Sequence, residues 1–203
     1  GIGTGRVATA LRGAGASVIG LDASAAMLTA LQSKELPPSE TGATIASVRA
    51  DMATLPFRSS SLRGAVATFN TLFNLTTEAA QARCVSEVGR VLASGGSFVV
   101  EAIVAPDPPE RIDDVSVRTI EVDRLVLTAS VLDPDAQTIT GQHVEISEAG
   151  TRLRPWMLRY LTTDQLDELA EAAGLSLEAR WSDWQGTPFD PTGRLHVSTY
   201  RRR

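Results

Sequence analysis

The sequence predicts an α/β domain, in which a parallel sheet with helices on both faces carries an antiparallel β insertion and ends in an antiparallel strand pair. Two observations lead to this fold class. Over residues 1–103, short apolar runs alternate with segments of helical periodicity, which is the pattern of a parallel sheet joined by crossover helices. From about Val115, apolar runs follow one another with only turn residues between them, which indicates an antiparallel meander.

The first half of the chain alternates between helix and strand signals. Helices are expected from about Val7 to Gly13, at 25–32 with Ser24 as N-cap, and from Thr76 or Thr77 to Leu92. Strands are expected at 17–21, 44–48, 65–69 and 97–103. Pro37-Pro38 marks a loop, and Gly95-Gly96 is expected to turn the chain into the last of these strands.

The second half predicts a meander, a helix and two last strands. The meander strands are expected at 125–132, 138–147 and 151–159, with a bulge at Gly141, where the apolar parity slips. Thr162 or Thr163 should cap a helix that runs to Ala173. Strands at 175–181 and 194–202 are then expected as an antiparallel pair at the sheet edge. We therefore expect one domain over residues 1–203, with the antiparallel insertion at 113–160.

Composition narrows the classes of partner. The net charge is −5 and the pI about 5.1, which argues against a nucleic-acid partner or an anionic membrane surface. No apolar run approaches the roughly 20 residues of a membrane span. Cys84 is the one cysteine, it falls in a predicted helix, and no cysteine-rich metal site exists. We expect a cytoplasmic protein without a metal.

Three alternating glycines, Gly1, Gly3 and Gly5, precede the first helical segment. A glycine turn at the start of a helix lets backbone approach a ligand closely, and it directs free N–H groups at that ligand. Such a turn normally follows a buried strand. We therefore expect a first strand and an N-terminal cap upstream of Gly1.

Acidic residues follow two of the predicted strands. Asp22 lies at the end of the strand after the glycine turn, and its carboxylate can accept hydrogen bonds from both hydroxyls of a ribose. Asp51 follows the next strand, where its carboxylate can accept from an adenine amine while Met52 contacts the base. Ligands of parallel sheets bind at these carboxyl ends. The alternatives are a simple N-cap role for Asp22 and a surface turn for Asp51.

Taken together, these motifs resemble the class I S-adenosylmethionine-dependent methyltransferases, which have a Rossmann-like sheet. The resemblance covers residues 1–103 and also includes Gly95-Gly96 before a strand that ends in Glu101. It implies S-adenosylmethionine as cofactor, with the glycine loop under its methionine part. The remaining cofactor-binding residues that the resemblance implies are Asp22 and Ala23 at the ribose, Asp51 and Met52 at the adenine, and Asn70 and Thr71 at the methionine end and substrate mouth.

Two other functions remain open at this stage. Residues Gly3 to Ala8 also satisfy the G-x-G-x-x-A pattern of NAD-dependent oxidoreductases. Against that function, such enzymes do not require a second acid at Asp51, and the antiparallel tail stands where a second mononucleotide-binding half would be. The other alternative is a catalytically inactive, cofactor-binding module that acts in regulation or oligomerisation.

The absence of two motifs narrows the class of methyl acceptor. Asn70-Thr71-Leu72-Phe73 stands where amino-directed DNA methyltransferases resemble one another in an Asn/Asp-Pro-Pro-aromatic motif. Base C5 methylation needs a cysteine nucleophile, whereas core packing is the expected role of Cys84. We therefore expect a small-molecule N or O acceptor. The insertion is similar in layout to that of small-molecule N-methyltransferases, including amino-sugar enzymes, which implies a lobe over the site or a homodimer contact.

An ammonium acceptor must lose a proton before it is methylated. The candidate bases are His143, Tyr160 and Glu101, whereas His196 is placed on an edge strand. Arg152, Trp156 and Tyr160 share one parity of a predicted strand and could present an aromatic, cationic face to a substrate. The alternative is a strand that packs on the last helix.

Overall fold

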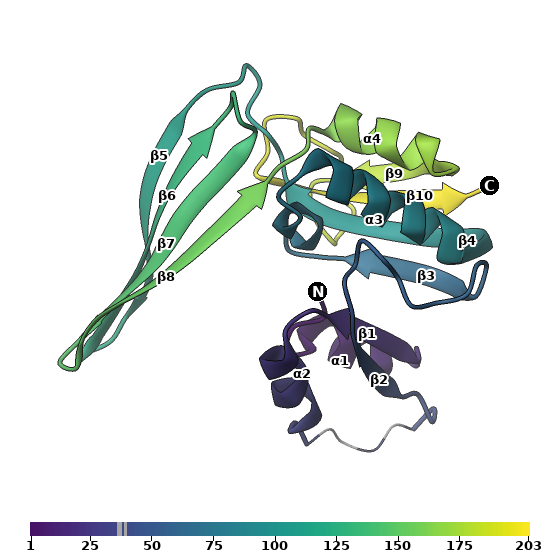
Figure 1. The fold of residues 1–203 in the computed structure, drawn as a ribbon, viewed down its shortest axis with the longest axis horizontal. Helices are drawn as coiled ribbons and strands as arrows, with labels where there is room; N and C mark the ends of the chain where they lie inside the picture. The colour runs from purple at the N-terminus through teal and green to yellow at the C-terminus, as the bar shows by residue number, and fades with distance from the viewer. Residues whose placement is uncertain (36–37, 39) are drawn as a thin grey trace. The chain divides into compact units, whose positions relative to one another are not determined.

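The computed structural model describes residues 1–35, 38 and 40–203 of the chain (Figure 1). These residues pack into two compact units, Gly1–Ser59 and Ser60–Arg203. The loop expected at Pro37-Pro38 includes residues outside that set. Within the described part of the chain, no helix is both long and apolar enough to cross a membrane.

The first unit is a two-stranded parallel sheet with two short helices. Its elements are α1 (Arg6–Gly13), β1 (Val18–Asp22), α2 (Ala25–Gln32) and β2 (Ile45–Arg49). The Ser24 hydroxyl accepts from the Met27 N–H, so the predicted N-cap of α2 is confirmed. β1 pairs with β2 in parallel from Val18↔Ile45 to Asp22↔Arg49, so both strands end at the same edge.

The second unit contains a four-stranded sheet in the order β3-β4-β10-β9. Its elements are β3 (Leu62–Ala67), the 3₁₀ helix η1 (Thr71–Asn74), α3 (Glu78–Val91), β4 (Leu92–Ile103), α4 (Thr163–Ala172), β9 (Leu175–Trp181) and β10 (Leu195–Arg202). β3 and β4 are parallel, and β10 is antiparallel to both of its neighbours. Thr77 caps α3, and Thr162 with Gln165 forms a capping box on α4.

Several predicted strand boundaries in this sheet are wrong, including the start of β3, which is Leu62 rather than Ala65. β4 begins at Leu92, so the two glycines lie inside the strand rather than before it. The β3–β4 register shifts between Leu62 and Gly64, and Gly95 has φ +74°, a backbone conformation that glycine tolerates. β3 ends at Ala67 rather than at Phe69, because Phe69 and Asn70 both have left-handed backbone conformations.

The predicted meander has four strands rather than three. It consists of β5 (Ile112–Ile120), β6 (Arg124–Asp133), β7 (Thr138–Ser147) and β8 (Gly150–Arg159), paired in that order (Figure 1). β5 was missed because its Asp and Ser residues interrupt the apolar run. The predicted bulge at Gly141 is wrong, since Gly141 pairs with Ser130 and Trp156 in unbroken register. Glycine is needed there because an added Cβ would collide with the Trp156 indole.

The core of the second unit lies on one face of its main sheet. Phe98, Val100 and Ala102 of β4 are buried there, paired with Tyr200, Ser198 and His196 of β10. α4 covers this face, since the Tyr200 hydroxyl donates to Asp167 Oδ1 at 2.6 Å. The expected edge position of His196 is wrong, because β10 lies between β4 and β9. His196 is therefore 1% exposed.

Candidate cofactor site

The glycine turn enters α1 with backbone conformations that require glycine. Gly3 has φ +56° and Gly5 has φ +83°. Gly5 is the N-cap residue of α1, and its carbonyl accepts from the Thr9 N–H at 2.9 Å. A Cβ added to Gly3 would meet no atom within 4 Å, whereas one added to Gly5 would collide with Leu31. The backbone at Gly3 is therefore open to a ligand, and Gly5 is needed for packing against α2.

Asp22 fastens the end of β1 to the glycine turn. Its Oδ2 accepts from the Gly3 N–H at 2.8 Å, and its Oδ1 accepts from the Ser24 N–H at 2.9 Å. The next residue, Ala23, is held through its carbonyl by the Arg49 guanidinium. Each carboxylate oxygen can accept a further hydrogen bond. The carboxylate is therefore oriented by backbone and retains acceptor capacity for a ligand hydroxyl.

Asp51 follows β2 at the same edge of the two-stranded sheet. It comes two residues after Arg49, the residue that pairs with Asp22. Its Oδ1 accepts from the Ala53 N–H at 2.8 Å, which forms a tight turn with Met52 at its centre. Asp51 is exposed and Met52 is half-buried. The structure thus brings Gly3, Asp22 and Asp51 to one end of the first unit.

In the second unit, Asn70 and Thr71 follow β3. The Asn70 N–H donates to the Glu101 carbonyl at 3.1 Å, and the Asn70 side-chain oxygen accepts from the Ile103 N–H at 2.8 Å. Glu101 is half-buried, and its carboxylate accepts from the Phe69 N–H at 2.9 Å. The structure therefore places Asn70, Thr71 and Glu101 together, and Glu101 contacts this turn.

The other two candidate bases lie in different environments. Tyr160 is 3% exposed, and burial, reinforced by the charge of Asp133, raises the pKa of its hydroxyl. A phenol with a raised pKa is a poor proton acceptor at neutral pH. His143 lies on β7, where its Nδ1 is 3.0 Å from the Thr128 hydroxyl and its ring is 5.9 Å from that of Trp156.

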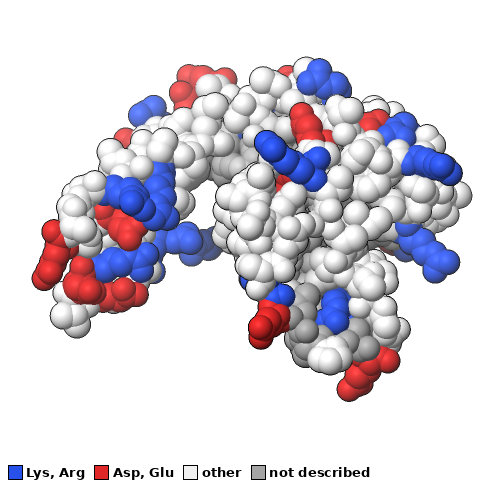
Figure 2. Space-filling model, turned by 60° about the horizontal axis from the view of Figure 1, so that its bottom comes forward, with Lys and Arg blue, Asp and Glu red and all other residues white. Residues whose placement is uncertain are grey.

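The predicted aromatic and cationic face forms only in part. Arg152 and Trp156 lie on one face of the meander, together with His143, while Tyr160 follows β8 and is buried. Glu145 on the same face accepts from both Arg124 and Arg154, at 2.8 and 2.7 Å. Figure 2 shows acidic and basic side chains gathered together on the meander, at the left. The face is thus one of paired charges.

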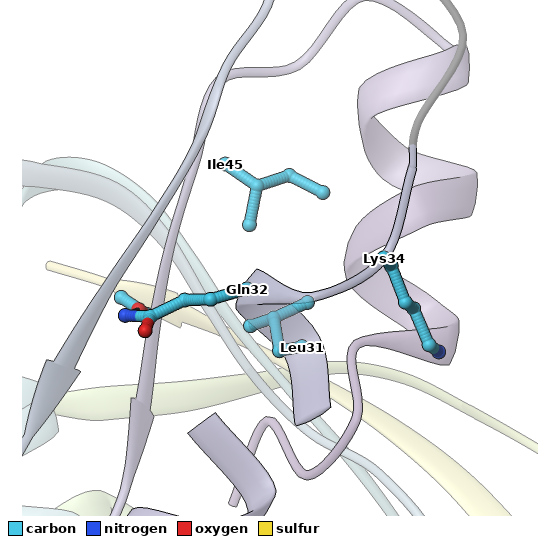
Figure 3. Close-up of a pocket in the computed structure, with 5 residues that line it drawn as sticks. Leu31, Gln32, Lys34 and Ile45 are labelled. Atoms are coloured by element: carbon cyan, nitrogen blue, oxygen red, sulfur yellow. Dashed lines mark hydrogen bonds between the residues drawn. The ribbon is translucent and has the colours of Figure 1, made fainter. Parts of the chain in front are cut away.

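A cavity of about 250 Å³ lies in the first unit beside α2 (Figure 3). It is lined by Leu31 and Gln32 of α2, by Lys34 just after α2, and by Ile45 and Ser47 of β2. Ile45 is the first residue of β2, whereas Asp51 follows its last residue. Two of the lining residues also contact the glycine turn, since Leu31 lies against Gly5 and the Lys34 ammonium donates to the Thr4 carbonyl at 2.6 Å.

Two features of the second unit escaped prediction from the sequence. Phe69 was assigned to a strand, although Asn70 is a residue type that tolerates a left-handed conformation and gave a signal for the turn. Gln81 is fully buried in α3, where it donates to the Arg159 carbonyl at 2.6 Å and accepts from the Arg159 guanidinium at 2.7 Å. The local sequence around Gln81 cannot predict a contact with a residue 78 positions away.

The comparisons with known proteins concern the whole chain. Residues 1–100 match a family model described as a methyltransferase domain. No curated protein matched the sequence. Among solved structures, the CcbJ methyltransferase from Streptomyces caelestis is 35% identical with a TM-score of 0.89, and the match covers 100% of this chain and 81% of CcbJ. The chain belongs to the S-adenosylmethionine-dependent methyltransferases.

More distant structures share the fold. CalS10, an amino pentose methyltransferase from Micromonospora echinaspora, is 24% identical with a TM-score of 0.69, and the match covers 98% of this chain and 80% of CalS10. The sugar N-methyltransferase KedS8 from Streptoalloteichus is 19% identical with a TM-score of 0.62, and that match covers 98% of this chain and 85% of KedS8.

As a methyltransferase of this family, the protein uses S-adenosylmethionine as its cofactor. The residues at the end of β1 fit that group. Gly3 leaves space beside its backbone, and the Asp22 carboxylate stands next to it with acceptor capacity for ribose hydroxyls. Family membership also removes the NAD-dependent oxidoreductase alternative.

Proposed function

We propose that this methyltransferase transfers the methyl group of S-adenosylmethionine to a nitrogen of a small-molecule acceptor by in-line displacement. The observation that carries the proposal is the meander. The matches to CalS10 and KedS8 cover 98% of this chain, so they include the β5–β8 strands. CalS10 is an amino pentose methyltransferase and KedS8 a sugar N-methyltransferase. An oxygen acceptor is the second candidate.

The cofactor contacts follow from the resemblance and from the contacts of each residue. We assign the glycine turn of Gly1, Gly3 and Gly5 to the methionine part, and Asp22 with Ala23 to the ribose. Asp51 and Met52 are assigned to the adenine, and Asn70 and Thr71 to the methionine end. The sulfonium supplies an already reactive methyl group. The protein's residues have to align the acceptor and exclude water.

His143 is the base candidate that the contacts leave most available. Tyr160 is buried with a raised pKa, and one oxygen of the Glu101 carboxylate accepts from the Phe69 amide. His143 is half-buried, and its Nδ1 lies 3.0 Å from the Thr128 hydroxyl. A His143→Gln variant should bind the cofactor as well as the wild type and should lose kcat by roughly 100-fold or more.

Binding and turnover test the proposal together. S-adenosylmethionine, S-adenosylhomocysteine and NAD are titrated into the protein by calorimetry, and labelled methyl transfer is then followed to amines, amino sugars and hydroxylated controls. We expect the two sulfur compounds to bind, NAD not to bind, and label to appear on an amine. If label appeared on hydroxylated acceptors alone, the proposed acceptor atom would be oxygen and not nitrogen. Cofactor binding without transfer to any acceptor would favour an inactive regulatory module.

The meander also supports a homodimer. Its strand registers place one set of side chains on a common face, and that face is largely apolar, although Thr140 and Gln142 also lie on it. The members of this apolar face are Val115, Val117, Ile120, Leu125, Leu127, Val131, Val144, Ile146, Leu153 and Met157. Val117 is 57% exposed and Leu153 is 59% exposed. An apolar patch of this kind marks an interaction surface.

We propose a second copy of the chain as the partner of this apolar face. Four strands of about ten residues span on the order of 600 Å² in projection. That approaches the roughly 800 Å² that each partner contributes to a standard interface. Val117→Glu should shift sedimentation from dimer to monomer, and Ser116→Glu, on the opposite face, should not. A monomeric wild type would overturn the dimer.

A further inference from the structure

β3 ends in a turn whose backbone is unusual for its residues. Phe69 has φ +55° and Asn70 has φ +59°, so two consecutive residues with side chains adopt the left-handed conformation. Asparagine visits this region, but an aromatic residue does so rarely. Such a pair persists only where the surroundings hold it in several ways at once, and it is characteristic of functional sites.

Thr71 closes the turn by donating its N–H and its hydroxyl to the Thr68 carbonyl, and three further hydrogen bonds tie the turn to β4. Glu101 supplies two of the acceptors of those three. The Glu101 carboxylate accepts from the Phe69 N–H at 2.9 Å, and the Glu101 carbonyl accepts from the Asn70 N–H at 3.1 Å. The third bond runs from the Ile103 N–H to the Asn70 side chain at 2.8 Å. The carboxylate is the one side-chain group that binds the Phe69 backbone in this set. It therefore fixes the residue that is hardest to hold.

The large apolar side chains of this segment differ in their exposure to solvent. Leu72 and Phe73, in η1, are buried, at 1% and 0% exposure, whereas Phe69 is 68% exposed. The Phe69 ring therefore projects from the carboxyl end of a parallel strand, beside Asn70. This is the end of the sheet at which ligands bind in α/β folds. A flat apolar ring there offers a surface for an organic acceptor, and its π-face attracts an ammonium group.

We infer that Glu101 is a positioning residue for methyl transfer: its carboxylate fixes the Phe69–Asn70 turn and so the ring against which the acceptor is placed. The inference rests on the proposed function, because it concerns the acceptor of that reaction. A general base would take the acceptor's proton on Oε1, because the Phe69 amide is bound to Oε2. A positioning carboxylate stays where it is, and its negative charge takes no part in the chemistry.

The two roles predict opposite results for a neutral isostere. Glu101→Gln keeps a side-chain oxygen that accepts from the Phe69 N–H, so kcat should stay within about threefold of the wild type with an unchanged pH–rate profile. Glu101→Ala removes the acceptor, so the acceptor KM should rise at least tenfold while cofactor affinity changes less than threefold. Glu171→Gln, an exposed glutamate of α4, is the control.

Hydrogen exchange gives a readout that is independent of turnover. The Phe69 and Asn70 amides should exchange at least tenfold faster in Glu101→Ala than in the wild type, and Glu101→Gln should retain most of the protection. Because the Gln variant is isosteric, it decides the question even if the Ala variant does not fold.

The possible outcomes distinguish the positioning role of Glu101 from the proposed function itself. A hundredfold loss of kcat in Glu101→Gln, with cofactor binding and amide protection intact, would make Glu101 the base and overturn the inference. Wild-type kinetics in both variants would also overturn it. A wild type that binds the cofactor but methylates no acceptor would instead contradict the proposed function.

Discussion

The turn at Gly3 and the turn at Phe69 solve the same backbone problem with different residues. In each, a carboxylate accepts the N–H of a left-handed residue: Asp22 holds Gly3 at φ +56°, and Glu101 holds Phe69 at φ +55°. Glycine adopts this conformation without strain. For Phe69 it costs about 1–2 kcal/mol, which the hydrogen bond must offset.

The difference shows what each turn exposes. At Gly3, the space where a Cβ would stand is open, so the backbone itself can meet a ligand. At Phe69, the strain is retained and an exposed ring results. We conclude that the first turn is built to present backbone and the second to present a side chain. Of the following experiments, three each act on one of the two turns and one acts on the core of the second unit.

The largest effect is expected from Asp22→Ala. The variant loses the carboxylate proposed for the ribose and also the anchor of the glycine turn. Two charge-assisted hydrogen bonds at about 1.5–3 kcal/mol each correspond to a rise of at least roughly 100-fold in the dissociation constant of S-adenosylmethionine. Calorimetry measures it, with circular dichroism to confirm the fold. A folded variant of unchanged affinity would remove Asp22 from the site.

The core of the second unit contains an acid-sensitive group, His196. Burial lowers the pKa of His196 to about 4, and the Arg180 charge acts in the same direction against a smaller opposing effect of Asp167. Above pH 6.5, His196 is neutral in both folded and unfolded states. Between pH 6.5 and about 4 the unfolded state alone binds the proton, so stability falls by roughly 3 kcal/mol in total.

Urea unfolding at several pH values should show that loss in the wild type and a flatter profile in His196→Gln. The glutamine keeps a polar group near Ser198, which His196 contacts at 2.8 Å. Equal pH slopes for the two proteins would mean that His196 is not the source.

Gly3→Ala separates backbone strain from ligand contact. The added Cβ meets no protein atom, so folding stability should fall by only about 1 kcal/mol from the left-handed conformation. Cofactor affinity should fall by tenfold or more, because the methyl group fills the space beside the backbone. Gly42→Ala is the matched control, with φ +70° and equally open space. If both variants bind S-adenosylmethionine alike, the glycine turn does not approach the cofactor.

The sequence predicted the first of these turns far better than the second. Alternating glycines before a helix and an acid after the next strand are local signals, and the structure joins Gly3 to Asp22 as they suggest. The hydrogen bond from Phe69 to Glu101 spans 32 residues, and its partners look like ordinary strand residues. For the same reason the helix caps were predictable, whereas the burial of His196 was not.

The fold shows the same division between local and long-range information. Periodicity identified α1 to α4 and most strands, because burial on one face imposes a repeat on each segment. It missed β5, whose face toward the Thr128 side of the sheet carries Asp114 and Ser116. It also misplaced the bulge at Gly141, where the glycine accommodates a cross-strand indole and not a register change.

Asn70 offers the smallest and most specific test of the comparison. Asn70→Gly and Asn70→Ala both remove the side-chain acceptor of the Ile103 N–H, but only alanine must bear the strain of φ +59°. The alanine variant should therefore be less stable than the glycine variant by about 1 kcal/mol in urea unfolding. If strain in the turn holds the Phe69 ring in place, glycine at position 70 relaxes the turn and loosens Phe69. The KM for the acceptor should then rise in Asn70→Gly, although that variant is the more stable of the two. Equal stability of the two would mean that the turn relaxes without strain, and the contrast with Gly3 would then lie only in what is exposed.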